Sequence, residues 1–308
     1  MACRFFSAEE ARLIARAKLP RMMFDFVDGA AGDETLSKIN IHAIDRVRLM
    51  PRVLADVSNR DLSHKILAIE TGHPFGIAPM GMCNLTWPGA DLMLARAAAA
   101  RRFPICVSTA SSSTLETMQQ AAKGNAWFQL YADRSEAFTD ELLERAEMAG
   151  YKVLILTVDV PVLSQRTRDL RNGFKYPFQL GPRQVWDFAT HPRWSLATLI
   201  ATLQSGVPRT MNYATSKSEA SFERGADRTG ADWDYFERLR ARWQHKLVIK
   251  GVQCPSDAKK IKSAGADAIW VSNHGGRQLN AAPSAIEALV AIRDAVGNDF
   301  PLIMDCLL

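Results

Sequence analysis

Residues 268–279 read Ala-Ile-Trp-Val-Ser-Asn-His-Gly-Gly-Arg-Gln-Leu, an apolar run that passes directly into polar side chains and glycines. A short run rich in β-branched and aromatic residues, closed by glycine, predicts a buried strand followed by a turn. In β/α folds the reactive side chains stand where the parallel strands end and their loops open. This stretch therefore predicts a strand and a functional loop together.

Six other short apolar runs extend the same pattern along the chain. They are Phe75–Met80, Ile105–Ala110, Trp127–Ala132, Val153–Asp159, Leu247–Val252 and Pro301–Asp305. Helix-like stretches such as Gly89–Arg101 and Ser135–Ala149 lie between them, and strand–helix alternation implies parallel strands with right-handed crossovers. Residues 75–308 are therefore predicted to form a TIM (β/α)8-type barrel that lacks the eighth strand and its helix.

Two segments fall outside this alternation. Ser7 and Glu10 have capping-box spacing, and helices are expected to Lys18, through Met22 to Val27, and from about Asp33. Residues 1–74 are therefore predicted to form an N-terminal helical cap with a short extended segment. Residues 174–245 are predicted to be an insertion, in which residues 194–203 form an amphipathic helix. That helix either packs on the barrel or makes peripheral contact with a membrane.

The composition is that of a globular protein. The chain has 308 residues, 47% of them hydrophobic and 23% charged, with a net charge of +5. The five cysteines show no C-x-x-C spacing, which favours reduced thiols, and no signal peptide or membrane-spanning run is visible. We expect a cytoplasmic protein, with peripheral attachment to an inner membrane as the alternative, and neither a metal site nor a nucleic-acid partner.

Polar residues collect at the ends of the predicted strands. Alternation places Gln129 with Tyr131, and Ser272 with His274, on one face of their strands. Further polar residues end the other strands, namely Ser108, Thr157, Asp159, Lys250 and Asp305. An isolated Ser or Thr at the end of a strand more often stabilises a turn than serves a site. Because polar residues end six of the predicted strands, we expect them to form one shared site. No G-x-G-x-x-G follows a strand, which disfavours NAD chemistry.

The stretches Leu-Thr-Val-Asp at 156–159, Ile-Lys-Gly-Val at 249–252 and Ser-Asn-His-Gly-Gly-Arg-Gln-Leu at 272–279 resemble one enzyme family. It is the family of FMN-dependent 2-hydroxy acid oxidases and dehydrogenases, which includes glycolate oxidase and the lactate and mandelate dehydrogenases. The resemblance extends from Leu19-Pro20 to Asp305. It implies FMN as cofactor, a small 2-hydroxy acid as substrate, and oxygen, a quinone or a carrier as electron acceptor.

The resemblance also assigns catalytic and substrate-binding roles. His274 would be the catalytic base, and Asp305 would hold its imidazole and stabilise the cation. Arg277 and Arg166 would bind the substrate carboxylate, because a guanidinium fork matches a carboxylate. Tyr131 would point its hydroxyl toward the substrate. Arg168 and Arg171 are expected to be solvated.

The same resemblance places the flavin. Lys250 would stabilise the negative charge that reduction creates at the pyrimidine end of the ring. The backbone of Ala78, Pro79 and Met80 would lie against the ring. Hydrogen bonds to the flavin would come from Ser108, Gln129, Thr157 and Ser272.

Two departures from the family pattern shape the alternatives. Phe26 stands where the family usually has a tyrosine that contacts the substrate carboxylate. After Asp305 the family continues with a Gly-rich segment and a Gly-Arg phosphate loop, where this sequence has Cys306-Leu307-Leu308. The sequence thus predicts an FMN-dependent enzyme, or a truncated and inactive remnant unable to hold FMN. A non-enzymatic interaction protein acting through residues 174–245 is a third hypothesis, and a homo-oligomer is compatible with each.

Overall fold

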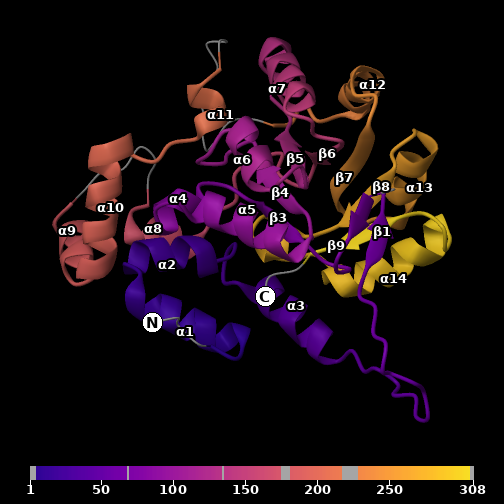
Figure 1. The fold of residues 1–308 in the computed structure, drawn as a ribbon, viewed down its shortest axis with the longest axis horizontal. Coiled ribbons are helices and arrows are strands. Elements are labelled where there is room, and N and C mark those ends of the chain that lie inside the picture. Colours follow the sequence, from indigo (N-terminus) through magenta and orange to yellow (C-terminus); the bar gives the residue numbers. More distant parts are fainter. Residues whose placement is uncertain (1–4, 68, 134, 175–180, 217–227, 306–308) are drawn as a thin grey trace.

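The computed structural model describes residues 5–67, 69–133, 135–174, 181–216 and 228–305. Its main sheet contains seven parallel strands that pair in chain order. The strands are β3 (Ile77–Met80), β4 (Ile105–Ser108), β5 (Ala126–Tyr131), β6 (Val153–Thr157), β7 (Lys246–Val252), β8 (Ala268–Val271) and β9 (Leu302–Met304). The sheet curls like a barrel with one strand absent, which confirms the predicted fold (Figure 1).

Crossover helices cover the outer face of the sheet. They are α5 (Ala90–Arg101), α6 (Leu115–Ala121), α7 (Glu136–Met148), α12 (Trp233–Arg242), α13 (Pro255–Ser263) and α14 (Ala285–Val296). Side chains that point outward from the strands, such as Phe128, Leu154 and Ile249, join these helices in the largest apolar cluster. Because successive strand residues alternate between faces, the next position along each strand points into the barrel.

The interior of the barrel holds a second apolar cluster. Trp127, Ile155, Val248 and Trp270 fill it, and all four are buried. Leu67 enters the same cluster from a hairpin of β1 (His64–Ile66) and β2 (Ile69–Thr71). The predicted extended segment is therefore a hairpin. It covers the end of the barrel at which the strands begin, so only the opposite end is available for a site.

Three N-terminal helices lie beside that opposite end. They are α1 (Ala8–Lys18), α2 (Arg21–Asp28) and α3 (Thr35–Asp45). Half of the predicted capping box is present: Ser7 Oγ accepts from the Glu10 N–H at 3.1 Å, while the Glu10 carboxylate accepts from the Phe6 N–H at 2.7 Å and not from that of Ser7. Helix α3 packs on the 3-10 turn η1 (His274–Gly276), where a Cβ on Gly276 would lie 2.8 Å from the Ser37 nitrogen. Only glycine permits this approach of the helical cap to the barrel.

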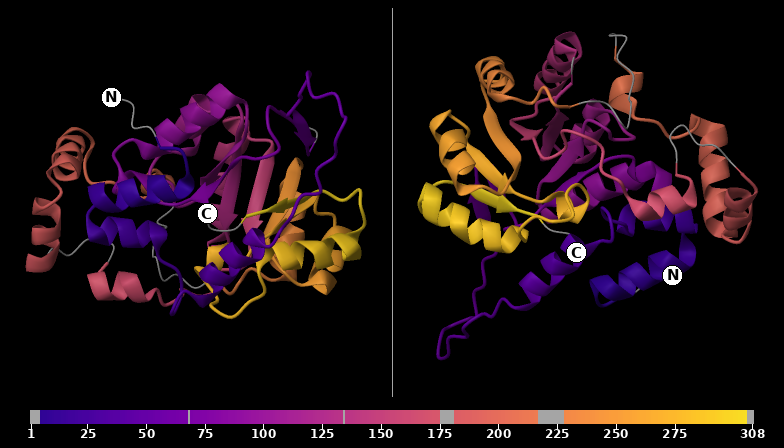
Figure 2. Two further views of the ribbon diagram at one scale, coloured as in Figure 1. Left: turned by 90° about the horizontal axis from the view of Figure 1, so that it is seen from below. Right: turned by 180° about the vertical axis from the view of Figure 1, so that it is seen from behind.

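The chain between β6 and β7 carries further helices. These are α8 (Thr167–Asn172), α9 (Pro182–Ala189), α10 (Pro192–Ser205) and α11 (Met211–Ala214). The short helix α4 (Cys83–Thr86) follows β3. The helix predicted at 194–203 lies within α10. Its buried Trp194 donates from Nε1 to the Thr86 carbonyl at 2.7 Å, which anchors α10 to α4. Helices α9 and α10 stand at the periphery of the molecule (Figures 1 and 2).

Candidate active site

The inward-facing polar residues meet where the strands end. Ser108 is level with Gln129, Tyr131 with Thr157, and Thr157 with Lys250. Ser108, Gln129, Thr157, Lys250 and Ser272 are all buried. The structure therefore brings the predicted residues of five neighbouring strands together on one inner surface.

Lys250 is the buried cation of this surface. Its side chain is 3% exposed, and its Nζ donates to Ser272 Oγ at 2.7 Å and to Asp305 Oδ2 at 2.5 Å. The ammonium group also lies 5.1 Å from the centre of the Trp270 ring. A buried ammonium is tolerated only where a counter-charge and hydrogen bonds replace water, and Asp305 supplies that charge.

His274 pairs with a different carboxylate from the one that the sequence predicted. Its Nδ1 lies 3.0 Å from Asp159 Oδ1, whereas Asp305 is bound to Lys250. The predicted pairing of Asp305 with His274 is therefore wrong. Met304 is level with Val271, so Asp305 stands level with Ser272, two residues short of His274. Asp159 lies two residues beyond the end of β6, far enough along the barrel axis to contact the imidazole.

Local backbone geometry supports this pair. His274 has φ of 56°, an uncommon conformation for a side chain with a Cβ and one that is often retained at functional sites. Gly251 has φ of 104°, and a Cβ there would lie 2.6 Å from the Asp159 Cβ. Glycine at 251 thus leaves the space that the Asp159 side chain occupies. The motif ending in Asp159 was the sequence signal from which this partner could have been found.

Two buried side chains at the strand ends have unsatisfied polar atoms. Both amide atoms of Gln129 and the Thr157 hydroxyl have no hydrogen-bond partner among the described residues. Buried polar groups are nearly always paired, and an unpaired one costs roughly 1–3 kcal/mol. These orphaned donors and acceptors indicate that a polar ligand completes the surface beside Lys250.

Tyr131 lies at the outer end of the same surface. Burial and the nearby Asp159 carboxylate raise the pKa of its phenol to about 12, against the lowering effect of Arg228, Arg166 and Arg277. The structure thus gathers the positive charges of both predicted carboxylate-binding arginines around one phenol. Arg228 is a third arginine here, which the sequence analysis did not identify.

Arg277 is also tied to the N-terminal cap. It donates to the carbonyls of Phe26 and Val27, each at 2.8 Å, and to that of Gly29. These bonds satisfy carbonyls at the C-terminus of α2, where a cation is favoured. Phe26 stacks on Phe174 with ring centroids 4.6 Å apart and an interplanar angle of 9°. Residue 26 is therefore next to Arg277, with an apolar neighbour.

Arg168 was predicted to be solvated, and that prediction is wrong. Its guanidinium binds Asp28 at 2.6 Å and Glu34, and it lies 3.5 Å from Asp25. Although burial opposes ionisation of Asp28, hydrogen bonds from Arg12 and Arg168 lower the pKa of this carboxyl. The network joins α8 to α2 and the start of α3, so it fixes the cap against the loop that follows β6.

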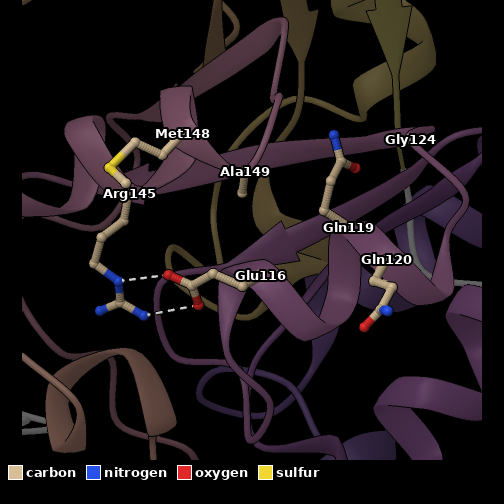
Figure 3. A pocket seen from close by; sticks show the side chains of 7 residues that line it. All are labelled: Glu116, Gln119, Gln120, Gly124, Arg145, Met148 and Ala149. Carbon is tan, nitrogen blue, oxygen red and sulfur yellow. Dashed lines mark hydrogen bonds and ion pairs between the residues drawn. The ribbon is translucent and has the colours of Figure 1, made fainter.

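A pocket of about 550 Å³ lies elsewhere, between α6 and α7 (Figure 3). Arg145 and Glu116 line it and form a two-point ion pair at 2.8 and 3.1 Å. Gly124 and Ala149 also line it, and both precede strands, so the pocket opens toward the end of the barrel opposite to His274. None of the predicted site residues lines it, and we assign it no role in the chemistry.

A family profile described as FMN-dependent dehydrogenase matches residues 15–307. The chain belongs to this family. The (S)-mandelate dehydrogenase of Pseudomonas putida is 36% identical over 311 residues, which cover 99% of this chain and 77% of that protein. An L-lactate dehydrogenase of Pseudomonas syringae pv. syringae (strain B728a) is 34% identical and covers 97% of this chain and 80% of the relative.

The fold agrees with this membership. A crystal structure of "monotopic membrane protein (S)-mandelate dehydrogenase" superposes with a TM-score of 0.90 and 35% identity, covering 98% of this chain and 81% of that one. The family description makes FMN the cofactor. The orphaned Gln129 and Thr157 atoms and the buried Lys250 match the amide-like edge of a flavin, which offers donors, acceptors and developing negative charge. The residues present therefore fit FMN.

Proposed function

We propose that this FMN-dependent dehydrogenase oxidises an L-2-hydroxy acid to the corresponding 2-oxo acid. Two relatives are named for mandelate and lactate, both 2-hydroxy acids. The observation that carries the proposal is the His274–Asp159 pair at the strand ends that also hold Lys250. A base with a fixed imidazole beside a buried cation is suited to proton removal coupled to charge transfer.

His274 is proposed as the base. Asp159 is acceptor-only when ionised, so the 3.0 Å contact places the imidazole proton on Nδ1 and leaves the Nε2 lone pair available. Nε2 then takes the proton of the substrate hydroxyl, and Asp159 stabilises the resulting imidazolium. FMN, when bound, would supply the two-electron acceptor for the hydride equivalent that leaves the substrate.

The other residues bind and orient. We propose that Arg277 and Arg166 bind the substrate carboxylate and that the protonated phenol of Tyr131 donates to the substrate. Lys250, Ser272, Gln129, Thr157, Ser108 and the backbone from Ala78 through Pro79 to Met80 would hold the flavin. Asp305 is proposed to hold Lys250 in place, since it is the only carboxylate bound to that side chain in the part of the chain described.

Visible absorption tests this proposal. The purified protein should carry a flavin spectrum that bleaches when L-lactate or L-mandelate is added without oxygen. His274→Ala should keep the flavin spectrum and bleach at least about 100-fold more slowly, because general base catalysis contributes roughly 10²–10⁴-fold. His42→Ala, at an exposed position on α3, is the matched control and should bleach normally. A colourless protein would instead support the alternative of a chain unable to hold FMN.

We also propose that the outer face of α9 and α10 makes peripheral contact with a membrane. Large apolar side chains are exposed along both helices, namely Val185, Trp186, Leu196, Leu199, Ile200 and Leu203. Within the described ranges no helix is long and apolar enough to cross a bilayer. An exposed apolar helical face of this kind favours lying in the interface instead. One similar crystal structure is titled a monotopic membrane protein.

Cosedimentation with phosphatidylglycerol vesicles tests the contact. Replacing Leu196, Leu199 and Leu203 together by glutamine should release most of the vesicle-bound protein, because burying each leucine contributes roughly 1.5–3 kcal/mol. The matched control replaces Leu49, Leu54 and Leu62, which are also exposed but lie before β1. Equal binding of both variants would remove α9 and α10 from the proposal.

A further inference from the structure

Asn40 is a buried polar residue of the N-terminal cap to which the proposed function gives no role. It lies on α3, where the buried residues Leu36, Asn40 and Ala43 have the spacing of one helix face. Its side chain is 1% exposed, at a position where an apolar residue would pack without the cost of desolvating an amide. Asparagine is also a poorer helix former than leucine or alanine. The contacts of Asn40 show what offsets these two costs.

Asn40 and Asn273 form a reciprocal pair of amide hydrogen bonds between the cap and the barrel. Asn40 Nδ2 donates to Asn273 Oδ1 at 3.0 Å, and Asn273 Nδ2 donates to Asn40 Oδ1 at 2.8 Å. Backbone groups fix the orientation of both amides. Asn40 Oδ1 accepts from the Ala285 N–H at 3.3 Å. Asn273 Nδ2 donates to the Pro283 carbonyl at 3.0 Å, and Asn273 Oδ1 accepts from the Gly276 N–H at 3.2 Å. The Asn273 amide thus makes all four hydrogen bonds of which it is capable.

Asn273 in turn holds the turn that carries His274. It is the N-cap of η1, through its bond from the Gly276 N–H. All three residues of this turn have positive φ, with 56° at His274, 64° at Gly275 and 72° at Gly276. For a residue with a Cβ this conformation is disfavoured, and it persists only where the surrounding structure holds it. The barrel supports the turn through the His274 N–H, which donates to Ser272 Oγ at 3.0 Å. The cap supports it through the asparagine pair.

We propose that Asn40 is a positioning residue that acts through Asn273 to hold the imidazole of His274 in place. This inference rests on the proposed function, in which His274 is the base. Without the Asn40 side chain, the Asn273 amide loses two of its four hydrogen bonds. The turn can then relax to a negative φ at His274, which moves the imidazole away from Asp159. A base works only within hydrogen-bond reach of the proton that it removes, so a small displacement slows the reaction.

A double-mutant cycle on anaerobic flavin reduction by L-lactate tests the inference. Asn40→Ala should lower the maximal reduction rate about 10- to 100-fold. In the His274→Ala background the same substitution should change the rate less than about twofold, because the residue through which Asn40 acts is gone. Asn40→Ser, which leaves a hydroxyl in the space, takes the place of the alanine variant if that variant does not fold. The matched control is Ala43→Gly on the same buried face of α3, which weakens the helix and should keep the wild-type rate within about twofold.

Nuclear magnetic resonance of protein labelled with 13C at histidine Cε1 gives a readout that needs no turnover. The His274 signal, identified by its absence from His274→Ala, should move in Asn40→Ala and stay in place in Ala43→Gly. An unmoved signal overturns the inference, as does a wild-type rate in Asn40→Ala.

Equal slowing by Asn40→Ala in both backgrounds also overturns it, because a role in stability alone does not depend on His274. If His274→Ala reduces flavin at the wild-type rate, or the chain holds no flavin, the proposed function fails instead. The His274 signal then decides the inference by itself, since a shift in Asn40→Ala supports the positioning of His274 and an unchanged signal refutes it.

Discussion

Replacing each of the two aspartates near the strand ends, Asp159 and Asp305, by asparagine gives the sharpest test of the proposed chemistry. Asp159 contacts His274 at 3.0 Å, and its side chain is 12% exposed. A hydrogen bond to a charged group in such a setting contributes about 1.5–3 kcal/mol. Since roughly 1.4 kcal/mol corresponds to a tenfold change in rate, Asp159→Asn should slow flavin reduction about 10- to 100-fold.

Asp305→Asn should behave differently because Asp305 forms its ion pair with Lys250. Breaking a buried ion pair by removing one partner costs about 3–5 kcal/mol, since the remaining charge is left uncompensated. The Asp305→Asn protein should therefore unfold at a lower temperature and release flavin more readily. Asp159→Asn should keep the melting temperature and flavin content of the wild type.

The assay is anaerobic stopped-flow reduction of the flavin by L-lactate, combined with thermal unfolding of the same preparations. The asparagine side chain has nearly the shape of aspartate, so the comparison isolates the charge. A wild-type reduction rate in Asp159→Asn, together with slow reduction and an unchanged melting temperature in Asp305→Asn, would refute the pairing described above. It would restore Asp305 as the partner of His274.

Other positions give further expectations. Gly251→Ala should slow flavin reduction at least about tenfold in stopped flow, because the added Cβ would overlap Asp159 at 2.6 Å; an unchanged rate would show that this space is not needed. Phe26→Tyr should tighten the binding of L-lactate about fivefold by adding a hydroxyl donor, and an equal Kd would show that position 26 does not contact substrate. The Tyr131 pKa of about 12 exceeds its usual 10, so between these pH values the folded state holds the proton more tightly and stability falls as pH rises. Tyr131→Phe should lose less stability than the wild type in urea titrations across that window. Arg168→Met should lower the free energy of unfolding by about 2 kcal/mol, measured with urea, and a value near zero would mean that the ion pairs are not stabilising.

Sequence pattern was a reliable guide wherever the structure is local and periodic. The strand at residues 268–271 and its six partners follow from short apolar runs separated by helices. Alternation along the strand predicted that Gln129 and Tyr131 share one face, and the structure shows that this is the inner face, which also carries Trp127. The N-cap at Ser7 is equally local, and the hydrogen bond from the Glu10 N–H to Ser7 Oγ was predicted from spacing alone.

Contacts between distant segments were beyond the same reasoning. Arg168 resembled a surface arginine because its partners Asp28 and Glu34 lie more than one hundred residues earlier in the chain. The Leu67 hairpin could not be anticipated for a similar reason, since Leu67 joins an apolar cluster whose other members come from strands far away in the sequence. Such contacts depend on how the cap and the loops dock, which apolar periodicity does not encode.

The choice between Asp159 and Asp305 shows which part of the site depends on how distant strands are aligned and not on local sequence pattern. Both carboxylates stand at inward-facing positions just beyond their strands, so strand alternation by itself does not decide which of them pairs with His274. Register separates them, because Asp305 is level with Ser272 and therefore with the Lys250 ammonium, whereas Asp159 lies above the end of β6. The left-handed turn at His274 then directs the imidazole to the upper layer. The site is thus ordered by height along the barrel axis: a lower layer of Lys250, Ser272 and Asp305 that suits the flavin, and an upper layer of His274, Asp159 and the arginines that suits the substrate. A substitution in the lower layer should first affect flavin retention and stability, and one in the upper layer should first affect the rate and the choice of acid.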